Sequence, residues 1–140
     1  MGDRARLLVS AGVIYRTGRV LVGQRRETDR HPLKWEFPGG KVEPGESPQQ
    51  ALVRELCEEL QIIATVGAEL AYYEHEYPSG SCVRLLFLAV PNFRGELNNH
   101  VYKQICWIRL EDLERLDFLE GDVEFVRRLA RGDFRQQLEA

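Results

Sequence analysis

The sequence predicts an α/β fold built around a mixed β-sheet. Apolar, β-branched segments of strand length precede, separate and follow segments with helical periodicity. The connections include both hairpin-length turns and longer loops, which suit antiparallel and parallel strand pairs in one sheet. A length of 140 residues is enough for one domain with a real hydrophobic core, so residues 1–140 are expected to form a single domain.

The first half of the chain predicts a β-hairpin followed by a helix. Residues 7–15 and 19–24 have the composition of strands and flank a Thr17-Gly18 turn, and residues 27–32 form a polar loop. A helix is expected from about Pro48, with Ser47 as its N-cap. Its core-facing stripe consists of Leu52, Leu56 and Leu60, which recur every fourth residue.

The second half predicts three more strands and two more helices. A strand is expected within residues 62–77, where the alternating sequence turns His75 toward solvent. The next strand, at 81–90, follows the turn at 78–80. The remaining expectations are a loop at 91–99, a strand at 104–108, a short helix at 110–116, a helix at 123–129 with Asp122 as its N-cap, and a stretch at 131–140 that is either a helix end or a frayed tail.

The composition argues against several classes of protein. The net charge is −3 and basic residues form no run, which argues against binding to duplex nucleic acid. The chain begins without a signal-peptide pattern and has no apolar stretch of membrane-spanning length, so a cytosolic protein without membrane association is expected. Cys57, Cys82 and Cys106 form no Cys-x-x-Cys pair and are expected to be reduced, buried thiols.

Three glutamates crowd the last turns of the central helix. Glu55, Glu58 and Glu59 stand at i, i+3 and i+4, so each pair repels by roughly 0.2–0.5 kcal/mol, and the negative end of the helix dipole adds to this. A hard divalent cation such as Mg²⁺ would convert the repulsion into ligation, because it prefers carboxylate and phosphate oxygens. Arg54 can pair with Glu58 at i+4 or with Glu46 and so hold the acids in place. The alternative is a solvated acidic face with an i,i+4 pair of Arg54 and Glu58.

The segment around this helix resembles the signature of the Nudix hydrolases. Gln61 stands where the family has glycine, and a left-handed helix end there would cost a non-glycine residue about 1 kcal/mol. The positions that match the signature at the family's spacing are Gly40, Glu46, Arg54, Glu55, Leu56, Glu58, Glu59 and Ile62.

The resemblance implies a Nudix α/β/α sandwich in which residues 39–62 form a loop-helix-loop catalytic box. It implies that Mg²⁺, replaceable by Mn²⁺, is held by the carbonyl of Gly39 and by Glu55, Glu58 and Glu59. Glu55 is then either a ligand or the general base. The catalytic set is completed by Arg54, which braces the loop together with the structural residues Gly40 and Glu46.

A wider likeness to the MutT-like branch of the family, over residues 9–129, suggests where a nucleotide would lie. Arg25 matches an arginine that faces the substrate phosphates, and Lys41 is a second candidate for this contact; an ordinary surface position is the alternative for both. Phe37 is either part of the core and pocket wall or a stacking platform. Tyr77 matches a pocket aromatic that could stack on the base, or is an exposed strand tyrosine.

Two positions depart from the MutT-like pattern. A late-loop glutamate of the branch aligns with Val101, so either Glu96 replaces it or the helix supplies all the acids. Asp122 stands where the branch has a base-reading asparagine. An ionised aspartate only accepts hydrogen bonds, which favours an exocyclic amine such as N4 of cytosine, whereas a protonated one could hold a modified guanine. A simple N-cap role for Asp122 is the alternative.

These expectations converge on a Mg²⁺-dependent hydrolase that cleaves canonical or oxidised (d)NTPs, such as 8-oxo-dGTP or a cytidine nucleotide, to the monophosphate and pyrophosphate. Such an enzyme would serve nucleotide pool sanitation and DNA repair. Other Nudix substrates, such as a nucleotide sugar, a dinucleoside polyphosphate or an RNA 5′ end, are the alternative, as is a non-catalytic nucleotide-sensing module. The expected partner is a small nucleotide, bound to a monomer or a homodimer.

Overall fold

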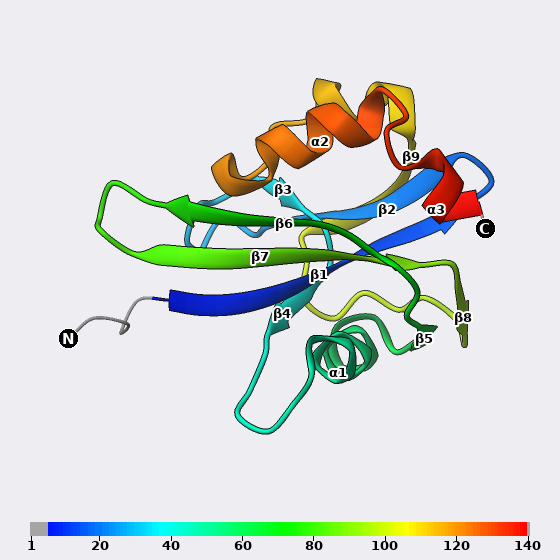
Figure 1. The fold of residues 1–140 in the computed structure, drawn as a ribbon, viewed down its shortest axis with the longest axis horizontal. Helices are drawn as coiled ribbons and strands as arrows, with labels where there is room; N and C mark the ends of the chain where they lie inside the picture. The colour runs from blue at the N-terminus through cyan, green and yellow to red at the C-terminus, as the bar shows by residue number, and fades with distance from the viewer. Residues whose placement is uncertain (1–5, 140) are drawn as a thin grey trace.

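The computed structural model describes residues 6–139, which form an α/β/α sandwich (Figure 1). A mixed sheet lies between α1 on one side and α2 with the C-terminal α3 on the other. The strands are β1 (Arg6–Arg16), β2 (Arg19–Gln24), β3 (Trp35–Glu36), β4 (Gly39–Lys41), β5 (Ile63–Thr65), β6 (Glu69–Glu76), β7 (Cys82–Val90), β8 (Asn92–Arg94) and β9 (Gln104–Arg109). The helices are α1 (Pro48–Leu60), the 3₁₀ helices η2 (Leu110–Arg115) and η3 (Glu120–Asp122), α2 (Val123–Ala130) and α3 (Arg135–Glu139).

The main sheet is organised around β1. Its path runs β3-β2-β1-β7-β6, with β4 also paired to β1 and β9 to β2. The long β1 and β7 are parallel, whereas the other pairs in this sheet are antiparallel. The β1–β2 hairpin turns at Thr17 (φ 45°) and Gly18 (φ 82°), the pair of left-handed residues that a two-residue hairpin loop requires. The predicted α/β class and first hairpin are therefore confirmed.

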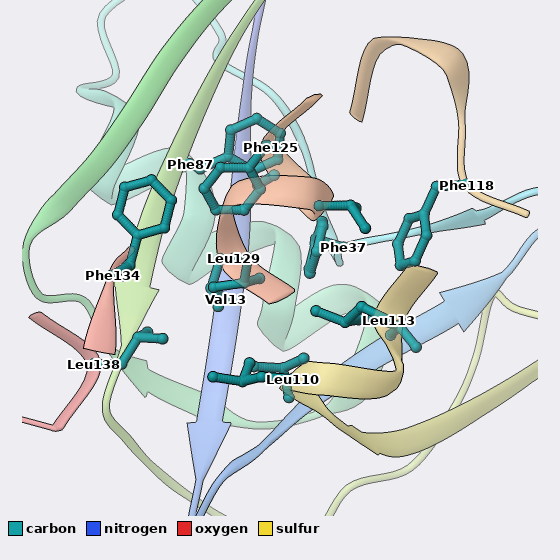
Figure 2. Close-up of a cluster of buried hydrophobic side chains, with 14 of the residues drawn as sticks. Val13, Phe37, Phe87, Leu110, Leu113, Phe118, Phe125, Leu129, Phe134 and Leu138 are labelled. Atoms are coloured by element: carbon teal, nitrogen blue, oxygen red, sulfur yellow. The ribbon is translucent and has the colours of Figure 1, made fainter. Parts of the chain in front are cut away.

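Each face of the sheet has its own hydrophobic core because side chains alternate along β7. Leu86 and Leu88 pack toward the leucine stripe of α1, while Phe87 lies on the opposite face with α2. There the rings of Phe87 and Phe125 stack with centroids 3.9 Å apart (Figure 2). These two cores hold the sheet between its helices and fix the position of α1.

Several element boundaries differ from the sequence predictions. The strand expected within residues 62–77 is two strands, β5 and β6, and the loop expected at 91–99 begins with β8, which pairs with β5. The stretch at 131–140 is not a frayed tail up to residue 139: it contains α3, and Phe134 and Leu138 are 3% and 2% exposed in the core of the α2 face.

Two further features are the exposure of the cysteines and the length of the helices. The expectation of buried cysteines is wrong for Cys57, which is exposed on α1, while Cys82 and Cys106 are half-buried. None of the helices in residues 6–139 has the length and apolarity needed to cross a membrane.

Candidate active site

The start of α1 is fixed by its own sequence. Ser47 accepts a hydrogen bond from the backbone N–H of Gln50 through Oγ (3.1 Å), and Gln50 Oε1 accepts one from Ser47 N–H (2.9 Å). This capping box, with Pro48 in the first turn, satisfies N–H groups that would otherwise lack partners. The leucine stripe of α1 is fully buried, so the glutamates of its last two turns lie away from the core.

The end of α1 is held by the loop that follows β8. Gln61 adopts the left-handed conformation (φ 60°, ψ 33°) that the family's glycine suggested, and its N–H donates to Cys57 O. The N–H groups of Asn98 and His100 donate to the carbonyls of Leu60 (2.9 Å) and Glu59 (3.0 Å). These bonds satisfy the last carbonyls of the helix and hold the acidic turn against this loop.

Arg54 ties the acidic residues together. Its Nε and Nη2 donate to the two carboxylate oxygens of Glu46 at 2.7 and 3.0 Å, and its Nη1 lies 3.2 Å from Glu55 Oε2 and 3.4 Å from Glu58 Oε1. Nη2 also donates to Lys41 O at 3.1 Å. The hydrogen bond from Arg54, with a backbone bond within the loop, lowers the pKa of Glu46 to about 2. The predicted pairings of Arg54 with Glu46 and with Glu58 are both present.

Glu55 and Glu59 are brought together behind the glycine pair. A Cβ on Gly40 would lie 2.4 Å from the Glu55 carboxyl group, so only glycine leaves room for this carboxylate. Glu59 Oε1 accepts from Gly39 N–H at 3.3 Å, and the side chain is hydrogen-bonded to Glu55. Burial, and then the charge of Glu55, raise the pKa of Glu59 to about 9. The two acids therefore share a proton at neutral pH.

These residues fit a divalent cation. A shared proton between two carboxyl groups marks a place where positive charge is needed, and a cation that replaces the proton would relieve the same repulsion. Within residues 6–139, no three His, Cys, Asp or Glu side chains form a ready-made metal cluster. Glu58 is 60% exposed and points toward Arg54, so it would join Glu55 and Glu59 by a change of rotamer.

Gly39 brings the backbone to this site in a conformation that other residues rarely adopt. Its φ is 152°, and a Cβ there would lie 2.0 Å from Ser10 O. β4 pairs with β1 through this contact, with Ser10 opposite Gly40 and Ala11 opposite Gly39. The glycine pair is thus fixed by the central strand and faces the acidic turn of α1.

A second set of polar residues extends the site toward β2 and β3, and of these the sequence analysis assigned a role only to Arg25. Arg25 Nη1 donates to Glu36 Oε1 at 3.2 Å, and its Nε donates to Arg30 O at 2.6 Å. Burial raises the pKa of Glu36, although Arg25 opposes this. The hydroxyl of Tyr102 is hydrogen-bonded to Glu36 and lies 3.4 Å from Glu59 Oε1. In the sequence, the charged Glu36 between the apolar Trp35 and Phe37 is the signal that could have indicated this network.

Asp122 stands at the N-cap position of α2, where its side chain is buried. It is 5% exposed, and within residues 6–139 its side chain makes no capping hydrogen bond to α2. Burial, with a smaller effect from the charge of Glu36, raises the pKa of Asp122 well above its usual range. Burial disfavours the charged carboxylate, so of the two forms considered the structure favours the protonated one.

Aromatic rings line the neighbourhood of Asp122. Tyr77 is half-buried, stacks on His31 with centroids 5.1 Å apart and meets His75 edge-on at 4.5 Å. Its pKa is raised by burial and by the carboxyl groups of Asp122 and Glu120. His75 does not face solvent as predicted: its Nε2 is buried and has no hydrogen-bond partner among the described residues.

The remaining candidates fall outside this centre. Phe37 is 4% exposed and stacks on Phe118 with centroids 5.3 Å apart, so the structure places it in the core, the first of its two expected roles (Figure 2). Lys41 is exposed next to Arg54, and Glu96 is exposed in the loop after β8. Val101, which aligns with the late-loop glutamate of the MutT-like branch, is 40% exposed, whereas the next residue, Tyr102, is buried.

Comparison with known proteins agrees with this geometry. The NUDIX domain family matches residues 6–129. The chain is 42% identical over 118 residues to the CTP pyrophosphohydrolase of Escherichia coli (strain K12), which covers 84% of this chain and 87% of that protein. It is 32% identical over 128 residues to the 8-oxo-dGTP diphosphatase of Haemophilus influenzae, covering 91% and 93%. The solution structure of the E. coli ORF135 protein has a TM-score of 0.84 at 38% identity, covering 96% of this chain and 94% of that one. The chain belongs to the Nudix hydrolase family.

Proposed function

We propose that this protein is a Mg²⁺-dependent pyrophosphohydrolase that converts (d)NTPs to the nucleoside monophosphate and pyrophosphate. The observation that carries the proposal is the pairing of Glu55 and Glu59 behind Gly39 and Gly40, with Arg54 holding the acidic turn in place. Relatives whose names specify CTP pyrophosphohydrolase and 8-oxo-dGTP diphosphatase activities, covering most of both chains, support the choice of a nucleoside triphosphate.

The cation would be held by the carbonyl of Gly39 and by Glu55, Glu58 and Glu59. When bound, it supplies neutralisation of phosphate charge and a lowered pKa for a coordinated water. To serve as ligands, Glu59 would have to be deprotonated and Glu58, which is exposed beside Arg54, would have to turn inward. Arg54 orients the Glu55 carboxylate through the 3.2 Å contact, so that Glu55 either ligates or takes the proton of the attacking water.

The triphosphate would lie between this acidic turn and Arg25. Arg25 is already oriented by Glu36 and Arg30 O, and its remaining guanidinium donors suit phosphate oxygens. Lys41 is exposed at the edge of the same region and offers a second positive charge. These two side chains bind and position the phosphates by donating hydrogen bonds.

Asp122 and Tyr77 would select the base. A neutral carboxyl group offers one donor and one acceptor side by side, which matches a base edge that also shows one of each. Cytosine presents this pattern at N3 and N4, as does 8-oxoguanine at N7–H and O6. On its N7/O6 edge, unmodified guanine shows two acceptors, which a single carboxyl proton cannot satisfy. A protonated Asp122 that meets this edge therefore favours 8-oxoguanine over unmodified guanine, and it also suits cytosine.

The test is a panel of nucleotides incubated with Mg²⁺, in which consumption and the release of pyrophosphate or phosphate are measured. Glu55→Gln is expected to lower turnover by about 10²-fold or more, the scale of a lost acid–base or electrostatic contribution. Asp122→Asn keeps a donor and an acceptor at all pH values, so it is expected to retain the base preference at pH 7 and to preserve it at high pH, where the wild type loses it.

Gln49→Ala, a substitution of a half-buried residue on the first turn of α1, is the control for nonspecific effects. Undiminished turnover in Glu55→Gln would refute the catalytic assignment. Release of phosphate rather than pyrophosphate would refute the proposed cleavage position. A preference for unmodified dGTP would refute the base assignment and leave the hydrolase assignment intact.

A further inference from the structure

Tyr102 is buried at the junction between the two polar networks of the site. The residue is 4% exposed, and its ring covers Gly23, where a Cβ would come within 2.6 Å of the ring atoms. Asn99 fixes the backbone at the same point: its Oδ1 accepts from Tyr102 N–H at 2.8 Å, and its Nδ2 donates to Tyr102 O at 2.8 Å. The position of the ring is therefore set from both sides.

The hydroxyl of Tyr102 lies between two carboxyl groups from different elements. It is 3.4 Å from Oε1 of Glu59 on α1, and it is hydrogen-bonded to Glu36 on β3. A phenol has one proton to donate, and its oxygen can accept one more. Tyr102 can therefore donate to one carboxylate while it accepts from the other, provided that the second is protonated.

We propose that Tyr102 is a positioning residue for the cation site, whose hydroxyl holds Glu59 in place as a ligand and links it to Glu36 and Arg25. The proposal rests on the proposed Mg²⁺-dependent hydrolysis and deepens it. Tyr102 itself contacts neither the cation nor the reacting phosphate, and it acts only through Glu59 and Glu36.

The physical role follows from what each carboxylate needs when a cation is bound. Ligating carboxylates are oriented by hydrogen bonds to their other lone pairs, and losing such a partner typically lowers metal affinity or activity by about 10–100-fold. Glu59 has two fixed donors, Gly39 N–H at 3.3 Å and the Tyr102 hydroxyl at 3.4 Å. Without the hydroxyl, one of these is lost in a buried place that water enters poorly.

The same hydroxyl gives the phosphate-binding side a connection to the cation. Arg25 is held by Glu36 at 3.2 Å, and Glu36 shares the hydroxyl with Glu59. A phosphate that draws Arg25 away from Glu36 would make Glu36 a stronger competitor for the hydroxyl that Glu59 accepts from. Cation binding and nucleotide binding are therefore expected to depend on each other through Tyr102.

The test compares wild type with Tyr102→Phe, which keeps the ring over Gly23 and removes only the hydroxyl. Mn²⁺ binding to the protein without nucleotide is measured by electron paramagnetic resonance, and the Mg²⁺ concentration for half-maximal hydrolysis is measured separately. Tyr102→Phe is expected to weaken Mn²⁺ binding by about 10-fold or more and to raise the Mg²⁺ requirement equally. The matched control is Tyr73→Phe. It removes a hydroxyl that lies outside the site and accepts a 2.8 Å hydrogen bond from Arg128, so both values should stay unchanged.

A double-mutant comparison tests the link to Glu36. The fold-change in Mn²⁺ affinity caused by Glu36→Gln is expected to differ by about twofold or more between the wild-type and Tyr102→Phe backgrounds. Asn99→Ala removes the two hydrogen bonds to the backbone of Tyr102 and leaves the Tyr102 ring unchanged, so it should also weaken Mn²⁺ binding. This variant replaces Tyr102→Phe in the test if thermal melting shows that Tyr102→Phe does not fold.

Equal Mn²⁺ affinity in wild type and a folded Tyr102→Phe would overturn the positioning role while leaving the hydrolase assignment intact. An identical effect of Glu36→Gln in both backgrounds would overturn the link to Arg25. Wild type that binds no Mn²⁺ and hydrolyses no nucleotide would overturn the proposed function together with this inference.

Discussion

Glu59 holds a proton at neutral pH that an ordinary glutamate would have lost. Burial and the charge of Glu55 raise its pKa from 4.5 to about 9, so the folded protein binds this proton more tightly than the unfolded chain. The contribution to stability is fully present below about pH 4.5 and is lost as the pH rises through 9. Between these values, the free energy of unfolding falls with rising pH.

A pH series on the metal-free protein tests this charge effect. In EDTA, the free energy of unfolding of wild type is expected to fall more between pH 6 and 9 than that of Glu59→Gln, which has no proton to lose in this window. Added Mg²⁺ should raise the melting temperature of wild type more at pH 9 than at pH 6, because cation and proton compete for the same oxygens. Parallel pH profiles for the two proteins in EDTA would show that Glu59 titrates normally.

At the scale of single residues, local spacing predicted the ion pairs but not the burial. The pairing of Arg54 with Glu46 and Glu58 follows from positions along one loop and one helix, and it is present. The raised pKa of Asp122 and the inward direction of His75 depend on segments far away in the sequence. Alternation along β6 could not show that the face carrying His75 is covered by the chain around Gly121, where an added Cβ would lie 3.4 Å from the His75 ring.

At the scale of secondary structure, α1 shows how a missing glycine is tolerated. Gln61 takes the left-handed conformation, and its Oε1 accepts from Asn98 Nδ2 at 3.0 Å. The strain of a non-glycine residue there is of order 1 kcal/mol, and the side-chain hydrogen bond offsets part of it. The end of the helix is thus formed by contacts with the loop after β8 rather than by local sequence.

Two substitutions at Gln61 separate the strain from the hydrogen bond. Gln61→Ala removes the bond to Asn98 but keeps a Cβ at φ 60°, whereas Gln61→Gly removes both. Gln61→Gly is therefore expected to be more stable than Gln61→Ala by about 1 kcal/mol, measured by urea unfolding. If the two variants were equally stable, the left-handed helix end would carry no strain.

The elements with strong periodicity were predicted well, and the short ones were not. The start of α1 at Pro48 and the bounds of β2 agree with the sequence, because a leucine stripe with a cap and an apolar run beside a tight turn are local signals. β5 and β8 have three residues each and exist because they pair with each other across the chain. Such pairing has no local signature.

At the scale of the whole molecule, the C-terminal segment completes the core on the α2 face. Phe134 stacks near Phe125 with centroids 5.2 Å apart, and Leu138 on α3 is 2% exposed. Arg128 also lies over the Phe134 ring at 4.8 Å. We therefore propose that residues 6–139 act as one domain, in which α3 is an integral part rather than an appendage.

A leucine-to-alanine substitution measures how firmly α3 is joined to the rest. Leu138→Ala is expected to lower the free energy of unfolding by about 2–3 kcal/mol, the usual cost of a cavity at a buried leucine. Gln137→Ala, its exposed neighbour, should change it by no more than about 0.5 kcal/mol. A similarly small effect of Leu138→Ala in urea unfolding would mean that α3 contributes little to the folded domain.

The stacking of His31 on Tyr77 joins the loop after β2 to the far end of β6. Both rings belong to outer segments that the two hydrophobic cores do not include. Substitutions of these two rings would leave both cores intact. The base contact proposed for Tyr77 would therefore be open to redesign separately from the fold and from the acidic turn of α1.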